Sequence, residues 1–223
     1  MPIAFIENGG LISPQYLSHT PSRDNPYKVL DGRGTLRLSR GDKNKLARAL
    51  AETERNLWAE VDYTDWELTG YEGYRGALDE PFLVGVVYKE GASPLEGPFE
   101  GYFIGWEIDS DMEDTLVADT GVFHYDPKLK AAIAQISDIP IIYWNEGARS
   151  RKAWVAQEYQ QMGMEFIKRL SGTAIVGEAR PTTSYKRLKQ LEAFGILEIL
   201  YEKLYPHLLG VGEHGYIVIG RIV

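Results

Sequence analysis

The stretch from Thr173 to Ile196 constrains the fold most, because signals for a strand, a turn and a helix follow one another there. A short apolar run at 174–176 predicts a strand, and Pro181 then interrupts the backbone. Side-chain oxygens that can cap a helix follow at Thr182, Thr183 and Ser184. Gly195 predicts the helix end, because glycine tolerates the left-handed conformation found there. A second strand is expected from Ile196. This is half of an α/β unit, and ligands usually bind where such a strand ends.

Composition narrows the class of protein. The chain has 223 residues, 44% apolar and 12% aromatic, which suffices for a packed core. It has no apolar run long enough to cross a membrane and no signal-peptide pattern at its start. The absence of cysteine excludes disulfides, thiol nucleophiles and cysteine metal sites, and fits a cytoplasmic protein. A net charge of −8 argues against nucleic acid as a partner.

The sequence pattern in the first third of the chain predicts an extension, followed by the start of a single domain. Residues 1–34 are rich in Gly, Pro, Asn and Ser and read as an extension, with an edge strand at 3–6. The domain is expected over 35–223, beginning with a strand at 36–38 and an amphipathic helix at 42–60. A loop or short helix with exposed aromatic rings should follow at 62–80. These rings either cover the core or line an acceptor pocket, and they are Tyr63, Trp66, Tyr71 and Tyr74.

The remaining elements predict an α/β (α+β) fold with a mixed, largely antiparallel sheet and helices on both faces. Runs at 82–89 and 99–108 predict an antiparallel hairpin with a long turn. Apolar residues at helical spacing predict a long helix over about 155–170. The other expected elements are strands at 116–125, 139–144, 196–200 and 216–223 and a helix at 128–136.

This order of elements resembles the GNAT superfamily of N-acetyltransferases, which bind acetyl-CoA. The best local match is the run ARPTTSYKRLKQLEAFGI, which ends at Ile196, and the resemblance covers roughly 35–223. It implies an acyl-CoA N-acyltransferase-like fold and the transfer of an acetyl group from acetyl-CoA to an amine by direct attack. The acceptor would be a small-molecule or protein amine.

In that superfamily a turn of the form Q/R-x-x-G-x-G/A holds the cofactor pyrophosphate with backbone amides at a helix N-terminus. The corresponding residues here are 147–153, GARSRKA, with one glycine and three cations. Cations are unfavourable at a helix N-terminus unless an anion is bound, which favours a phosphate there over an ordinary solvated helix start. The resemblance implies cofactor contacts from Tyr143, Gly147, Ala148, Arg149, Ser150, Arg151, Lys152 and Ser184.

A second alignment places the phosphate turn at 126–128, after a strand ending at Tyr125, and leaves an extra strand and helix to explain. The same region holds a grouping that resembles a metal site, which consists of Asp119, His124 and Asp126. One histidine with two aspartates is a weak signal, so no metal site is predicted.

The catalytic groups are less well defined. The superfamily often uses a tyrosine as general acid, four residues before the glycine that ends the helix, which is Gly195 here. Leu191 occupies that position in this chain, and Tyr185 is the nearest substitute. Candidates for a general base are Glu146, Glu178 and His124, since a carboxylate or imidazole can take a proton from an amine. Each also fits an ordinary surface or capping role.

Three functions are consistent with these observations. The first is an acyltransferase with acetyl-CoA between the strands at 139–144 and 173–178, which would have to diverge near residue 145. The second is a binding or inhibitory module that keeps the fold but has lost the cofactor chemistry, as the missing glycine and tyrosine suggest. The third is a nucleic-acid-modifying transferase that uses the cationic turn and exposed aromatic rings, against which the net charge argues.

Overall fold

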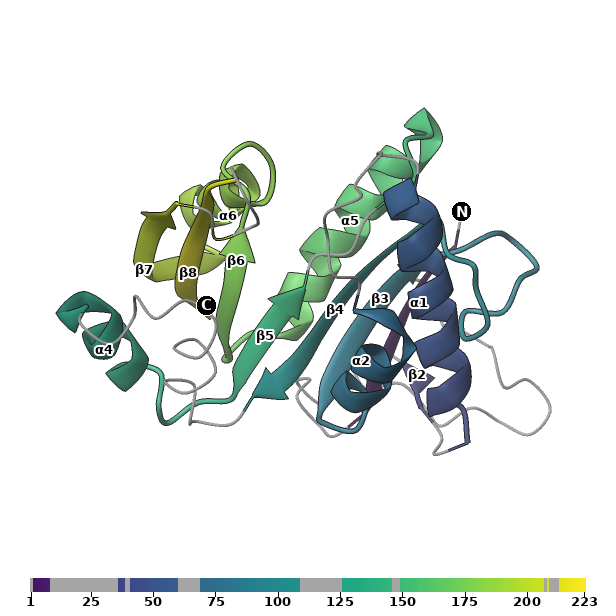
Figure 1. The fold of residues 1–223 in the computed structure, drawn as a ribbon, viewed down its shortest axis with the longest axis horizontal. Coiled ribbons are helices and arrows are strands. Elements are labelled where there is room, and N and C mark those ends of the chain that lie inside the picture. The colour runs from purple at the N-terminus through teal and green to yellow at the C-terminus, as the bar shows by residue number, and fades with distance from the viewer. Residues whose placement is uncertain are drawn as a thin grey trace. The chain divides into compact units, whose positions relative to one another are not determined.

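The computed structural model describes residues 2–8, 36–38, 41–59, 69–108, 126–145, 149–206, 208 and 213–223 (Figure 1). The chain divides into two compact units, which are described in turn. The first comprises Met1–Trp106 and Asn145–Leu170, and the second comprises Glu107–Trp144 and Ser171–Val223. Among the described residues, every helix is too short or too polar to span a bilayer.

The strands of the first unit follow the order β2-β1-β3-β4. They are β1 (Ile3–Asn8), β2 (Leu36–Arg37), β3 (Phe82–Val87) and β4 (Gly101–Ile108). β1 pairs in parallel with β2 and antiparallel with β3, and β3 pairs antiparallel with β4, which confirms the predicted hairpin. The expected edge strand at 3–6 is instead an interior strand. Its side chains from Ala4 to Ile6 are buried on both faces of the sheet, which is why it pairs on both sides.

Helices cover both faces of the sheet in the first unit (Figure 1). On one face, α1 (Lys43–Ala59) and α2 (Gly70–Ala77) share an apolar core with Val84 and Val86 of β3. On the other face, α5 (Ala153–Arg169) packs against β4, where the ring of Phe103 stacks on Tyr159 at 4.5 Å. The alternation of side chains along the strands places these contacts on opposite faces.

The expectation of exposed aromatic rings at 62–80 is wrong for Tyr74. It lies on α2 and is fully buried, and its hydroxyl is 2.6 Å from the hydroxyl of Tyr102 on β4. A buried phenol needs such a partner, so this ring belongs to the core. Tyr71 is partly buried against the same core, while Tyr63 and Trp66 lie outside the described residues.

The strands of the second unit follow the order β5-β6-β8-β7. They are β5 (Ile141–Asn145), β6 (Ala174–Ala179), β7 (Leu197–Tyr205) and β8 (Gly215–Ile222). β5 and β6 are parallel, whereas β8 pairs antiparallel with both β6 and β7. The predicted mixed, largely antiparallel α/β fold is therefore confirmed. The strand expected at 116–125 lies outside the described residues.

Two helices accompany these strands. α4 (Pro127–Ala134) places Leu129 and Ala132 in an apolar cluster with Val176 of β6 and Ile219 of β8. α6 (Ser184–Ala193) is the helix predicted after the 173–184 stretch. It ends where Gly195 adopts a φ of 68°, the left-handed conformation that glycine tolerates.

Candidate functional site

Arg149, Ser150, Arg151 and Lys152 lead into α5 and form what we call the cationic turn. The turn is fixed to the start of β4, because the Ser150 N–H donates to the Glu100 carbonyl at 2.8 Å and Arg149 forms an antiparallel bridge with Gly101. Ser150 is buried and its hydroxyl accepts the Lys152 N–H at 3.3 Å. The backbone that carries these cations is therefore bound to the start of β4.

Gly101 allows this close approach of turn, helix and strand. A Cβ atom at this position would lie 2.7 Å from the ring of Tyr159 on α5 and 3.3 Å from the Arg149 Cβ. The first of these distances is shorter than real Cβ atoms show, so a side chain here would force the Tyr159 ring to shift. The sequence marks Gly101 only as part of the hairpin, so its role at the turn was not anticipated.

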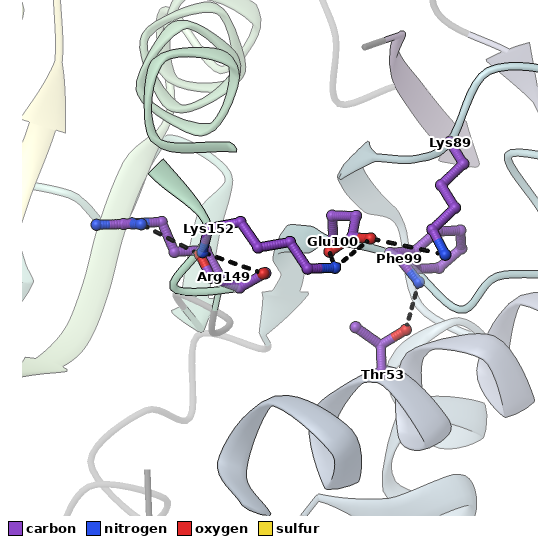
Figure 2. Close-up of polar contacts among 7 residues, drawn as sticks. Thr53, Lys89, Phe99, Glu100, Arg149 and Lys152 are labelled. Carbon is purple, nitrogen blue, oxygen red and sulfur yellow. Dashed lines mark hydrogen bonds and ion pairs between the residues drawn. The ribbon is translucent and has the colours of Figure 1, made fainter. Parts of the chain in front are cut away.

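The cations of the turn meet a carboxylate that the sequence analysis missed. Lys152 Nζ lies 3.0 Å from both carboxylate oxygens of Glu100, and Lys89 Nζ lies 3.9 Å from one of them. The Glu100 side chain is only 8% exposed. Figure 2 shows the two lysines reaching Glu100 from opposite sides. The only sequence signal for such a residue was the excess of positive charge at the turn, which calls for a counter-charge.

The backbone around Glu100 is held on both sides. Its N–H donates to the Val87 carbonyl of β3 at 2.8 Å, and the preceding Phe99 N–H donates to the Thr53 hydroxyl of α1 at 2.9 Å (Figure 2). Thr53 is itself fully buried. The backbone that carries this carboxylate is thus fixed to a strand and to a helix.

The start of α5 has no side-chain cap from its N-cap residue, which is also true of α2 and α6 but not of α4. Lys152 is the N-cap residue without a capping hydrogen bond, and the first turn of α5 contains no acidic residue. By contrast, Glu54 accepts from the backbone N–H groups of Thr69 and Gly70 at the start of α2. A helix N-terminus carries a partial positive charge from its unpaired N–H groups, so an uncapped start with nearby cations favours an anion.

The second alignment, which places the phosphate turn at 126–128, agrees less well with the structure. Asp126 is the N-cap of α4 and its carboxylate accepts the Lys128 N–H at 3.0 Å, so this helix start already holds an anion. Lys203, at 2.8 Å, is the main reason that the Asp126 pKa falls to about 2, with the Lys128 N–H and the Tyr201 hydroxyl contributing. No group of three or more metal-ligating residues occurs within the described part of the chain, and Asp119 and His124 lie outside it.

In the second unit, the ladder between β5 and β6 is short. It pairs Ile141 with Ala174 and Tyr143 with Val176, whereas β6 continues to Ala179 in contact with β8. Trp144 still lies close to β6, because its carbonyl oxygen is 3.1 Å from the position that a Cβ on Gly177 would take. The expected divergence near residue 145 stays a prediction. Tyr143 is half-buried, and Glu178, in the part of β6 beyond the ladder, is exposed.

Tyr185 and Ser184 lie at the start of α6. The Tyr185 ring stacks on Tyr216 of β8 with 3.7 Å between centroids, and burial raises its pKa, with a further increase from Glu202. The expected capping residues act differently from the prediction. Thr183 makes no side-chain cap, and the Ser184 hydroxyl accepts the Arg180 N–H at 2.9 Å, because the chain turns back on itself before the helix.

The structure thus gathers only some of the predicted site residues. Ser150 and the three cations of the turn are consecutive in the first unit, where Arg149 and Arg151 are exposed and Arg149 Nη1 donates to the Ser150 carbonyl at 3.2 Å. Ser184, Tyr185 and the buried Leu191 belong to α6 in the second unit. The remaining predicted residues lie outside the described part of the chain, namely His124, Glu146, Gly147 and Ala148.

Comparison with known proteins gives structural likenesses only. No family model matches the sequence, and no curated protein matches it. A putative acetyltransferase of the GNAT family from Desulfovibrio desulfuricans is similar in structure at 9% identity and a TM-score of 0.42, with 98% of each chain covered. Arabidopsis thaliana NAA60 in complex with acetyl-CoA is similar at 10% identity and a TM-score of 0.44, with 77% of this chain and 94% of that chain covered.

A third similar structure is yncA, a putative acetyltransferase from Salmonella typhimurium with its cofactor acetyl-CoA. Its identity is 8% and its TM-score 0.42, with 79% of this chain and 88% of that chain covered. These three solved structures are similar to this chain only at low identity and with TM-scores of 0.42 to 0.44. At such values the assignment of a function rests on the residues of this chain.

Proposed function

We propose that the protein is an acyltransferase that moves an acetyl group from acetyl-CoA to an amine. The observation that carries the proposal is the uncapped start of α5, which follows Arg149, Arg151 and Lys152 and has no acidic residue in its first turn. Such a helix start combines unpaired N–H groups with positive side chains, which is the chemistry that binds a diphosphate.

The residues that would hold the cofactor are those of the turn. Arg149, Arg151 and Lys152 supply charge for the diphosphate, while Ser150 fixes the backbone, and Gly147 and Ala148 remain in the proposal as backbone donors. Tyr143 and Ser184 stay in it as contacts from β5 and α6. Bound acetyl-CoA supplies a thioester whose carbonyl carbon is open to attack by an amine.

The protein has to move two protons in this reaction. A base takes one from the amine as the N–C bond forms, and an acid gives one to the sulfur as the C–S bond breaks. We propose Tyr185 as the acid, because a phenol is protonated at neutral pH and its ring is held at the start of α6 by stacking on Tyr216. Glu178, Glu146 and His124 remain the candidates for the base.

The role of Tyr185 has a direct test. Tyr185→Phe keeps the stack on Tyr216 but removes the proton, so we expect kcat to fall by about 100-fold, the effect of a general acid, with KM nearly unchanged. Tyr216→Phe is the matched control and should keep kcat. Equal small losses in both variants would remove Tyr185 from the mechanism.

A binding or inhibitory module on the same fold is the second candidate. Two observations favour it: Leu191 stands where the superfamily often has its catalytic tyrosine, and Glu100 already neutralises Lys152. The third candidate, a nucleic-acid-modifying transferase, has less support, because the net charge is −8 and Tyr74 is buried in the core.

For the acyltransferase, we also propose a cytoplasmic location and an acceptor that is a small-molecule or protein amine.

Calorimetric titration with acetyl-CoA, followed by a thiol-release assay with a panel of amines, tests the function. The proposal expects saturable binding of one acetyl-CoA per chain and release of CoA that depends on an added amine. Binding without thiol release would favour the binding module. The absence of binding at millimolar acetyl-CoA would exclude the acyltransferase.

A further inference from the structure

Glu100 stands out among the charged residues of the first unit because its carboxylate is buried while both lysines that contact it are substantially exposed. The exposed fractions are 8% for Glu100, 48% for Lys152 and 66% for Lys89. Lys152 Nζ is equidistant from both carboxylate oxygens, at 3.0 Å, whereas Lys89 Nζ is at 3.9 Å. Lys152 is therefore the principal partner of this carboxylate.

We propose that Glu100 is an internal counter-anion that holds Lys152 and competes with phosphate for it, so that this carboxylate sets how tightly the cationic turn binds a phosphorylated cofactor. The inference rests on the proposed function. Glu100 is a positioning residue in this scheme, since it acts on the ligand through Lys152.

The competition follows from the cost of leaving a buried charge alone. Without a ligand, Lys152 neutralises Glu100, and separating the two leaves a carboxylate that is mostly shielded from water. A phosphate that recruits Lys152 gains a charge-assisted hydrogen bond but leaves Glu100 with Lys89, at the longer distance. Hydrogen bonds from the Glu100 N–H to Val87 and from the neighbouring N–H to Thr53 hold this backbone, so the carboxylate can follow the lysine only by rotation of its own side chain.

The test compares coenzyme A with pantetheine, which shares its thiol arm but has no phosphate. We expect Glu100→Gln to bind coenzyme A about five- to tenfold more tightly than the wild type, and to bind pantetheine equally well. Glu96→Gln is the matched control, because Glu96 pairs with Lys45 at 3.0 Å and both side chains are 49% exposed. It should leave both affinities unchanged.

Lys152→Gln tests the other partner and does not depend on the folding of the Glu100 variant. If Lys152 moves to the phosphate, this variant should bind coenzyme A about tenfold more weakly. In the Lys152→Gln background, adding Glu100→Gln should then gain less than it does in the wild type, because the two residues act through one contact. Additive effects, or unchanged binding in Lys152→Gln, would show that Lys152 stays on Glu100 and would overturn the inference.

Inorganic diphosphate separates this inference from the proposed function. If wild type fails to bind coenzyme A but Glu100→Gln binds diphosphate more tightly than wild type does, the function is wrong and the counter-anion role stands. If Glu100→Gln and wild type bind diphosphate equally, or neither binds it, the inference is wrong. Weaker coenzyme A binding in a folded Glu100→Gln variant would also overturn it, because Glu100 would then support the site.

Discussion

The starts of α4 and α5 solve the same physical problem in opposite ways. At α4, the Asp126 carboxylate accepts a helix N–H directly and is held by Lys203 and Tyr201. At α5, the N-cap is Lys152, its side chain does not cap the helix, and the Glu100 carboxylate contacts the lysine side chain. The first arrangement is complete within the protein, whereas the second has no carboxylate at the helix N–H groups, which is where we propose that an anion binds.

The largest expected effect is on ligand binding at α5. Replacing both exposed arginines of the turn with glutamate (Arg149→Glu and Arg151→Glu) should weaken acetyl-CoA binding by about 100-fold, or about 2.7 kcal/mol, because two attractive charges become repulsive. Calorimetry measures the loss. Lys45→Glu on α1 is the control and should change the affinity little. Unchanged binding in the double variant would place the diphosphate elsewhere.

The next effect is on stability at α4. Asp126→Ala removes the cap of α4 and the acceptor for the Tyr201 hydroxyl, so the free energy of unfolding should fall by about 2 kcal/mol. Urea denaturation measures this. Asp79→Ala is the control, since Asp79 is 54% exposed and its ion pairs with Arg75 and Lys43 should matter little at the surface. Equal losses in the two variants would contradict the complete cap inferred for α4.

A smaller change, a gain in stability, is expected when α5 receives a side-chain N-cap like that of α4. The double variant Glu100→Gln with Lys152→Ser removes the buried ion pair and installs a capping hydroxyl, so ligand-free protein should become about 0.5–1 kcal/mol more stable to urea. Lys152→Ser alone should be destabilised, because Glu100 loses its principal partner. A double variant less stable than wild type would mean that the ion pair supports the fold.

The smallest expected effect is on the stability of the protein at acid pH. The pKa of Asp126 is lowered to about 2 in the folded chain, against about 3.9 for an unperturbed aspartate. The stability that this group contributes is therefore complete above about pH 4 and is lost as the pH falls towards 2. Thermal unfolding between pH 4 and 2 should show a steeper decline for wild type than for Asp126→Asn. Parallel curves for the two proteins would contradict the assignment of the low pKa.

The sequence predicted those elements whose signals are local. Apolar spacing gave α1 and α5, the β-rich runs gave the β3–β4 hairpin, and Gly195 marked the end of α6. β1 was expected at an edge, because pairing with both β2 and β3 involves residues far away in the sequence. Ser184 was expected as a cap, whereas the turn at Arg180 uses its hydroxyl.

The candidate site was predictable only in part for the same reason. The cluster of cations at 149–152 is visible in the sequence, and its place before a helix followed from the apolar pattern. Glu100 lies about fifty residues away from Lys152, and its burial depends on β3 and α1. The close packing of Gly101 on Tyr159 likewise exists only after the hairpin and α5 have met.

The most direct measurement is a crystal structure of the protein soaked with acetyl-CoA. The account predicts density for the diphosphate against the backbone N–H groups at the start of α5, within hydrogen-bonding distance of the side chains of Arg149, Arg151 or Lys152. Density for the bound cofactor at another part of the chain, with residues 149–152 unchanged and Lys152 still on Glu100, would contradict it.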